Sequence, residues 1–162
     1  FTSGSKPFRS AYFNKNIYVA LFNSDAIAVI SPSGSLLATI STGSGSKPNW
    51  FAQSQTRLFC SLYGTHKAVE ITPSNTVGTN YNCPTNDTPH APLVVMDKQL
   101  WVGGTTTPTS YIRVFDIDTG SLITSLAKGP NIPGMAFDGG NVWNISANGN
   151  YIQRTVLDLV NA

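Results

Sequence analysis

His66, Asp87 and His90 are the side chains best suited to metal or acid–base chemistry, because imidazole and carboxylate groups ligate divalent metals and transfer protons. A metal site needs such ligands to converge, and these three follow none of the spacings typical of metal-binding motifs. A hydrolytic site is not indicated either, since the sequence contains no Gly-x-Ser-x-Gly nucleophile elbow. We therefore predict no metal, no cofactor and no catalytic residue, and we interpret both histidines as loop residues.

Three tyrosines are expected to be exposed near loops, where they could stack on a sugar ring or on a partner's side chain. Together with polar residues of the same loops, they form the predicted contact set for a partner or ligand. This set consists of Tyr63, His66, Tyr81, Asp87, His90, Thr106 and Tyr111.

The two cysteines, Cys60 and Cys83, fall in a predicted strand and at the start of a long loop in the same repeat. A disulfide requires their Cα atoms to come within about 7 Å of each other, and such a bond is reasonable in an exported protein. A third strand is expected between the two segments, so two separate thiols are the alternative. The sequence leaves both open.

Prolines recur along the chain at a nearly constant period. Pro7, Pro48, Pro92 and Pro133 are 41, 44 and 41 residues apart, and each opens a similar run of short apolar segments. A period of this length is typical of β-propeller blades, in which a four-stranded sheet is repeated about an axis.

Two further patterns recur in register with the prolines. A polar–aliphatic–aromatic segment follows each proline, with its aliphatic residue eight to ten residues after the proline, at residues 16–19, 57–60, 99–102 and 141–144. In three repeats a hairpin turn follows, at residues 30–36, 71–77 and 117–122, where Gly or Asn can supply a positive φ. Three patterns in a fixed order predict four related blades.

Composition agrees with an all-β fold. Hydrophobic residues make up 41% of the chain and charged residues 11%, with 14 Gly and 10 Pro, which favours strands and turns over helices. We predict a single β-propeller domain or part-propeller, with blades at about residues 6–43, 47–84, 91–128 and 132–162. The last blade is predicted to lack its outer strand.

Large aromatic residues occupy equivalent places in the predicted strands. Because flat rings fill the wedge-shaped gaps between radial sheets, we expect these residues to form the core between blades. They are Tyr18, Trp50, Phe59, Trp101 and Trp143.

Residues 132–143 resemble the Pro-Gly, Phe-Asp-Gly, Asn-aliphatic-Trp pattern of the YVTN and NHL-like propeller repeats, whose superfamily includes the streptogramin lyases. Residues 111–120 are similar to that family's third strand and turn. The resemblance implies a ring of six or seven blades, with ligands meeting the loop-bearing face. For the lyases it implies a histidine base, a carboxylate and a divalent metal. This chain has a single glutamate, Glu70, and no pair of histidines at matching blade positions.

Loop lengths indicate which face of a propeller would bind a partner. The connections between first and second strands, and between third and fourth strands, include tight turns such as Ser33-Gly34 and Thr119-Gly120. The opposite face carries the longer segments 41–47, 83–91 and 103–110. Long loops on a rigid scaffold commonly carry recognition, so we place the binding surface there; the alternative is that they serve as spacers.

Charge and composition limit the classes of partner that the chain is expected to bind. A net charge of +2 without a basic stripe argues against nucleic acid, and no apolar run is long enough to span a membrane. Few charges and many hydroxyl and amide side chains suggest an extracellular or virion-surface protein. The missing outer strand leaves an edge for a protein partner or a second copy to complete the propeller.

We therefore expect a noncatalytic recognition and assembly module that binds a protein or glycan. One alternative is a carbohydrate-binding lectin, which would need similar pockets in successive blades. The other is a metal-dependent lyase-like enzyme, for which His66, Asp87 and His90 would have to converge.

Overall fold

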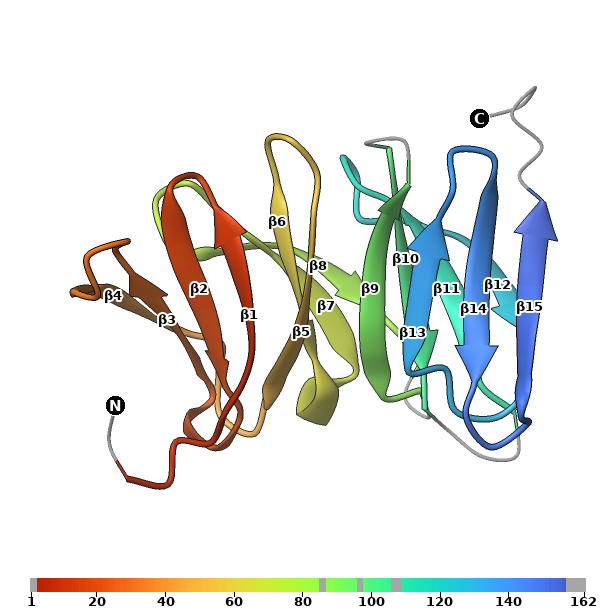
Figure 1. Ribbon diagram of the computed structural model, residues 1–162, viewed down its shortest axis with the longest axis horizontal. Coiled ribbons are helices and arrows are strands. Elements are labelled where there is room, and N and C mark those ends of the chain that lie inside the picture. The colour runs from red at the N-terminus through yellow and green to blue at the C-terminus, as the bar shows by residue number, and fades with distance from the viewer. Residues whose placement is uncertain (1–2, 85–86, 96–97, 106–108, 157–162) are drawn as a thin grey trace.

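The computed structural model describes residues 3–84, 87–95, 98–105 and 109–156, which form four antiparallel sheets (Figure 1). The first sheet contains β1 (Pro7–Phe13), β2 (Asn16–Leu21), β3 (Ala26–Ile30) and β4 (Leu36–Ser41). The second contains β5 (Pro48–Gln53), β6 (Leu58–Leu62), β7 (Lys67–Ile71) and β8 (Val77–Asn82). The third contains β9 (Pro89–Val95), β10 (Gln99–Gly104), β11 (Tyr111–Asp116) and β12 (Leu122–Ala127).

The fourth sheet contains β13 (Gly134–Phe137), β14 (Asn141–Ser146) and β15 (Tyr151–Val156). Within the described residues it has three strands, so the outer position is empty there, as predicted. Two short 3-10 helices follow second strands, η1 (Phe22–Ser24) and η2 (Tyr63–Thr65).

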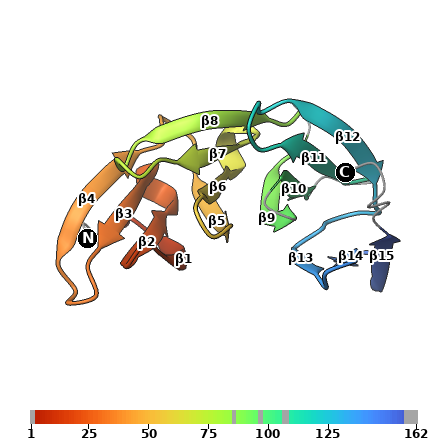
Figure 2. The ribbon, with the colours of Figure 1, turned by 90° about the horizontal axis from the view of Figure 1, so that it is seen from above.

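The sheets stand side by side in an open arc (Figure 2). Strands β1, β5, β9 and β13 line its inner side, and β4, β8 and β12 lie on the outside. In each sheet the strands follow one another in chain order. The chain therefore has the β-propeller fold, and the all-β prediction is confirmed.

Prolines mark the inner strands for a physical reason. An inner strand is an edge strand, so one row of its backbone groups needs no partner and a residue without an N–H is tolerated. Pro7 and Pro48 open β1 and β5, whereas Pro92 lies within β9 opposite Val102. The expectation that Pro92 opens its run of apolar segments is therefore wrong, because β9 already starts at Pro89.

Equivalent turns join the third and fourth strands of the first three sheets. The amide N–H of Gly34 donates to Ser31 O at 2.9 Å, and that of Gly120 donates to Asp116 O at 3.0 Å. Both glycines have positive φ, 89° and 74°, which a residue with a Cβ adopts at a cost. Asn75 fills the corresponding place in the second sheet with φ 59°. These are the hairpins predicted from the sequence.

Each sheet presents a different face to each neighbour. Tyr18, Phe59 and Trp101, at the aromatic position of the second strand, are 2%, 0% and 3% exposed and pack toward the following sheet. The residue before the aromatic packs toward the preceding sheet, as Leu58 and Leu100 do. Burial of each such large side chain contributes about 1.5–3 kcal/mol. The predicted inter-blade core is confirmed at these three aromatic positions.

Trp143 and Trp50 depart from that prediction. Trp143 is 38% exposed, because no sheet covers its face of β14 in the described part of the chain. Its indole N–H donates to Asp138 at 2.6 Å and is the main reason that the pKa of this carboxyl is held well below its usual range. Trp50 is half-buried on an inner strand, where it faces His90.

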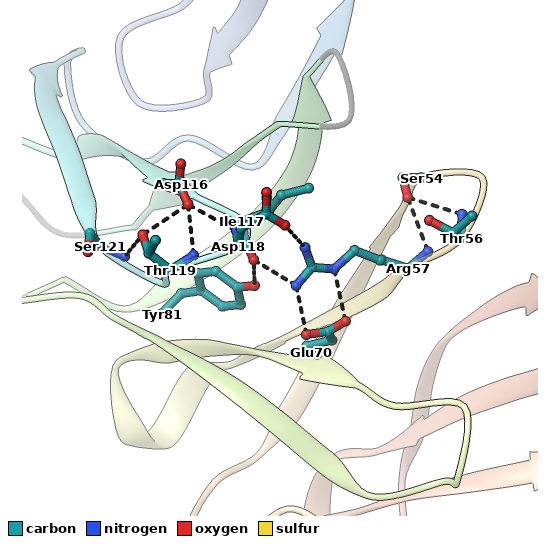
Figure 3. Close-up of polar contacts among 10 residues, drawn as sticks. All are labelled: Ser54, Thr56, Arg57, Glu70, Tyr81, Asp116, Ile117, Asp118, Thr119 and Ser121. Atoms are coloured by element: carbon teal, nitrogen blue, oxygen red, sulfur yellow. Dashed lines mark hydrogen bonds and ion pairs between the residues drawn. The ribbon is translucent and has the colours of Figure 1, made fainter.

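Arg57 joins the second and third sheets through ion pairs and hydrogen bonds on the face opposite the long loops, and Figure 3 shows these contacts. The Arg57 guanidinium donates to both Glu70 oxygens at 2.9 Å, to Asp118 Oδ1 at 2.7 Å and to Ile117 O at 2.7 Å. Tyr81 donates its hydroxyl to the same Ile117 carbonyl at 2.8 Å. Glu70 is thus a structural partner of Arg57.

No helix among the described residues is long and apolar enough to cross a membrane.

Candidate binding site on the long-loop face

The long-loop face lies along the lower edge of Figure 1, where second strands turn into third strands and where each sheet is linked to the next. In each of the first three sheets, the residue just before the third strand accepts a hydrogen bond from the linker that leads to the next sheet. Thr42 N–H donates to Asp25 O at 2.9 Å, Cys83 N–H to His66 O at 2.8 Å, and Lys128 N–H to Ser110 O at 3.0 Å. This arrangement repeats from sheet to sheet.

The side chains at these positions reinforce the same contact. The Asp25 carboxylate accepts hydrogen bonds from the amides of Gly45 and Lys47 at 2.7 and 2.9 Å, and the Lys47 amide is the main cause of its lowered pKa. His66 Nδ1 lies 2.8 Å from Asp87 O, and because a carbonyl can only accept, this nitrogen carries the proton. The His66 ring therefore helps to fix the position of the linker.

Asp87 is buried in that linker. Its carboxylate pairs with Arg113 of β11, at 2.6 Å to Nε and 2.5 Å to Nη2. A Cβ added at Gly104 would lie 3.1 Å from Asp87 Oδ1, so the backbone of β10 approaches this carboxylate closely. Asp87 thus ties the linker to the third sheet, and its carboxylate is engaged within the protein.

Tyr81 is fully buried, so the expectation that it is exposed near a loop is wrong. The alternation of β8 turns it toward the third sheet, where its ring lies 5.7 Å from that of Phe59 and 5.8 Å from that of Phe115. Burial raises its pKa to about 12. Tyr111 is half-buried, with the Arg113 guanidinium 4.2 Å above its ring. Thr106 lies outside the described residues.

The two cysteines are free and buried. Cys60 belongs to the core between the first and second sheets, whereas Cys83 packs in the core between the second and third. Because they serve cores on opposite sides of the second sheet, the structure contains separate thiols rather than the disulfide considered from sequence. Burial raises the pKa of each thiol to about 12.

Tyr63 and His90, both in the predicted contact set, come together in a group of aromatic rings at the inner edge of the long-loop face. We call this group the inner aromatic cluster. Successive ring centroids are 5.8, 6.0, 6.4 and 5.7 Å apart. The rings, in that order, belong to Phe8 of β1, Phe22 of η1, Tyr63 of η2, His90 of β9 and Trp50 of β5.

Three exposed cations border the inner aromatic cluster. The Arg9 guanidinium lies 4.4 Å from the centroid of the Trp50 ring and 4.8 Å from that of Phe8. Lys6 Nζ and Lys47 Nζ lie 4.9 and 5.8 Å from the Phe22 centroid. None of the three forms an ion pair with a carboxylate in the described part of the chain.

His90 is a residue of strand β9, so its interpretation as a loop residue is wrong. Its pKa is lowered from 6.5, first by burial and then by the positive charge of Arg9, so the ring is neutral at pH 7. Its Nδ1 is buried without a hydrogen-bond partner among the described residues, while its carbonyl accepts from the Ser61 hydroxyl at 2.7 Å.

Two hollows lie along β1, and Phe8 is the one ring of the cluster that lines either of them. One hollow, of about 270 Å³, is lined by residues of β1 and β2 that include Phe8 and Arg9. A second, of about 420 Å³, lies between β1 and β5. Half-buried rings and nearby cations suit a ligand that offers both a flat apolar face and negative charge.

A metal site from His66, Asp87 and His90 gains no support. Among the residues that the structure describes, no group of three or more His, Cys, Asp or Glu side chains is placed to hold an ion. His66 and the Asp87 carboxylate already serve linker contacts, and His90 lies among aromatic rings.

Sequence reasoning missed most of the inner aromatic cluster, although a signal was present. A Lys-Pro pair opens both β1 and β5, and an aromatic residue follows the apolar end of the second strand in both sheets. The structure shows these units to be equivalent. Phe22 N–H donates to Lys6 O, and Tyr63 N–H donates to Lys47 O, both at 3.1 Å.

The chain matches no protein-family model and no curated protein sequence. Among solved structures it is similar to a catalytically inactive virginiamycin B lyase from Staphylococcus aureus, crystallised with quinupristin, with a TM-score of 0.77 and 17% identity over 99% of this chain and 59% of that one. It is also similar to BamB from Moraxella catarrhalis (TM-score 0.71, 10% identity, 93% and 43% of the chains).

A chain of a nidogen/laminin complex is similar too, with a TM-score of 0.71 and 14% identity over 88% of this chain and 57% of that one. This chain thus spans about half the length of the structures it matches. At these identities the likeness shows the fold, and these neighbours are β-propeller proteins, as the sequence resemblance implied.

Proposed function

We propose that this chain is a noncatalytic recognition and assembly module, which binds a protein or glycan partner through its long-loop face and joins a second copy through its outermost sheets. The exposure of Trp143 carries the assembly part of this proposal. At the equivalent position, Tyr18, Phe59 and Trp101 are buried by the sheet that follows.

The uncovered face of the fourth sheet is broad and apolar. Trp143 pairs across the strands with Arg154, and Ile145 pairs with Ile152, so these four side chains share one face. Ile152 is 69% exposed. A face of this kind on every other sheet is covered by a neighbouring blade, and clustered exposed apolar side chains mark interaction surfaces.

The first sheet carries the complementary face. Tyr12, Ile17, Ile30 and Leu36 lie in one row across its four strands, on the side that turns away from the second sheet. Ile17 occupies the position at which Leu58, Leu100 and Val142 contact a preceding sheet. The aromatic face of one copy therefore suits the aliphatic face of another, and two reciprocal contacts would close a ring.

The similar structures support a role in assembly, since one lies in a nidogen/laminin complex. An extracellular or virion-surface location is part of the proposal and rests on composition, with 11% charged residues and many hydroxyl and amide side chains.

Light scattering coupled to gel filtration, over a wide range of concentrations, tests the assembly. We expect a dimer that dissociates on dilution. Ile152→Asp places a charge on the uncovered face and should give a monomer. Ile123→Asp, at an exposed isoleucine of β12, is the matched control and should leave the dimer intact. A wild-type protein that is monomeric at every concentration would contradict the proposal, as would equal effects of the two variants.

A lectin function is the second candidate. A lectin propeller needs similar pockets in successive blades, and the equivalent Lys6–Phe22 and Lys47–Tyr63 units provide such a repeat in the first two sheets. A glycan array probed with the intact chain, and with a Lys47→Gln variant as control, tests this candidate directly.

A further inference from the structure

We propose that the inner aromatic cluster binds an acidic carbohydrate, an oligosaccharide whose sugar units carry carboxylate groups. This inference rests on the assignment of the long-loop face as the recognition surface, and it names the ligand. It makes no use of the uncovered faces through which a second copy would join.

The aromatic part of the site provides surfaces for sugar rings. Trp50 and Tyr63 are half-buried, each next to His90, with ring centroids 5.7 and 6.4 Å from that of the histidine. Side chains held in this way lose little conformational entropy when a ligand binds. A flat apolar body packed on one side and open on the other favours contact with the apolar face of a ring.

The cations select for negative charge. Arg9 presents a planar guanidinium, which can hold a carboxylate through two parallel hydrogen bonds. Contact with Trp50 and Phe8 positions this group, and no described carboxylate competes for it. Lys6 and Lys47 add two further charges beside Phe22.

Among the described residues, Asp25 is an acidic group that interacts with one of these cations, Lys47, and its carboxylate is already hydrogen-bonded within the protein. The Gly45 and Lys47 amides both donate to its carboxylate, and the Lys47 charge also lowers its pKa. The electrostatic character of the site is therefore set by Lys6, Arg9 and Lys47.

The repeat in the site favours an oligomer with one charge on each unit. Lys6 and Lys47 both adopt the left-handed conformation, with φ of 47° and 51°, and each accepts a main-chain hydrogen bond from the aromatic residue of its own sheet. Two equivalent lysine–aromatic units in neighbouring sheets thus match two successive acidic sugars.

Isothermal titration calorimetry with an oligogalacturonate tests the proposal. Its methyl ester keeps the sugar rings and removes the charge, and polyglutamate keeps the charge and removes the rings. We expect binding of the oligogalacturonate that weakens as salt is added, and much weaker binding of the other two. Arg9→Gln and Lys47→Gln should each raise the Kd about tenfold, the effect of losing one charge-assisted hydrogen bond.

Lys15→Gln is the matched control, because Lys15 is an exposed cation in the turn between β1 and β2, at the end of the first sheet opposite the long-loop face, and has a positive φ as Lys47 does. This variant should bind with unchanged affinity. Absence of binding to the oligogalacturonate would overturn the proposal, as would polyglutamate binding of equal strength or an equal loss in Lys15→Gln.

The two proposals fail separately. The cluster uses residues of the first three sheets, so a monomeric Ile152→Asp protein should still bind the oligogalacturonate. A wild-type protein that forms the dimer but does not bind the oligogalacturonate would refute this inference alone. A wild-type protein that is monomeric but binds the oligogalacturonate would refute the assembly proposal alone.

Discussion

Replacing Arg57 with alanine should loosen the contact between the second and third sheets. The guanidinium makes two hydrogen bonds to Glu70, one to Asp118 and one to the Ile117 carbonyl, so its removal breaks every ionic contact in Figure 3. Because β7 supplies Glu70 and the turn after β11 supplies the other two partners, the substitution acts between blades.

The size of the effect follows from exposure. The side chains of Arg57 and Glu70 are 20% and 17% exposed, and breaking a fully buried pair costs about 3–5 kcal/mol. Since water still reaches this pair, we expect a loss of about 2 kcal/mol in the free energy of unfolding. The Asp118 side chain is 82% exposed, so Asp118→Asn should cost no more than about 0.5 kcal/mol.

Urea denaturation followed by circular dichroism measures both values. Adding Glu70→Gln to Arg57→Ala should recover about 1 kcal/mol, because it removes the charge left without a partner. The reasoning would be refuted if Asp118→Asn destabilised the protein as much as Arg57→Ala, or if Glu70→Gln made the Arg57→Ala protein less stable.

Three further predictions concern other parts of the molecule. Gly64→Ala should cost about 2 kcal/mol of stability, because the new Cβ would collide with the Gly45 carbonyl, whereas Gly140→Ala should be nearly neutral; urea denaturation compares them. Neither thiol should react with Ellman's reagent at pH 8 until urea is added, since burial raises both pKa values to about 12. A fast native reaction would contradict this. The free energy of unfolding should fall as pH drops below 6.5, because the unfolded His90 then binds a proton that the folded ring, with its lowered pKa, does not. His90→Gln should flatten this dependence, and an unchanged slope would argue against it.

Much of the fold could be predicted because its signals are local. The strands follow alternation and aromatic placement, and the hairpins follow Gly and Asn at positions of positive φ, as at Gly34, Asn75 and Gly120. Pro92 misled the prediction of β9. A proline inside a strand usually argues against it, and only the edge position of an inner strand makes it acceptable.

The site was harder to predict because it is assembled from distant segments. His90 and Tyr63 were proposed as contacts, but Phe8, Phe22 and Trp50 reach them only through the curvature of the sheets. The exposure of individual side chains was also hard to predict. Tyr81 lies one residue from a loop by sequence, yet strand alternation points it into the core, where Ile117 satisfies its hydroxyl.

Each blade has an aromatic side and an aliphatic side, and this alternation gives the row of blades a direction. An aromatic side always meets an aliphatic side, so two identical ends have no reason to join. In the proposed assembly, such contacts join copies head to tail, and the angle between neighbouring copies decides whether the row closes into a ring or continues as a spiral filament. A larger residue at Ala68, which is fully buried between the second and third sheets, should widen that wedge and disfavour closure of the proposed ring.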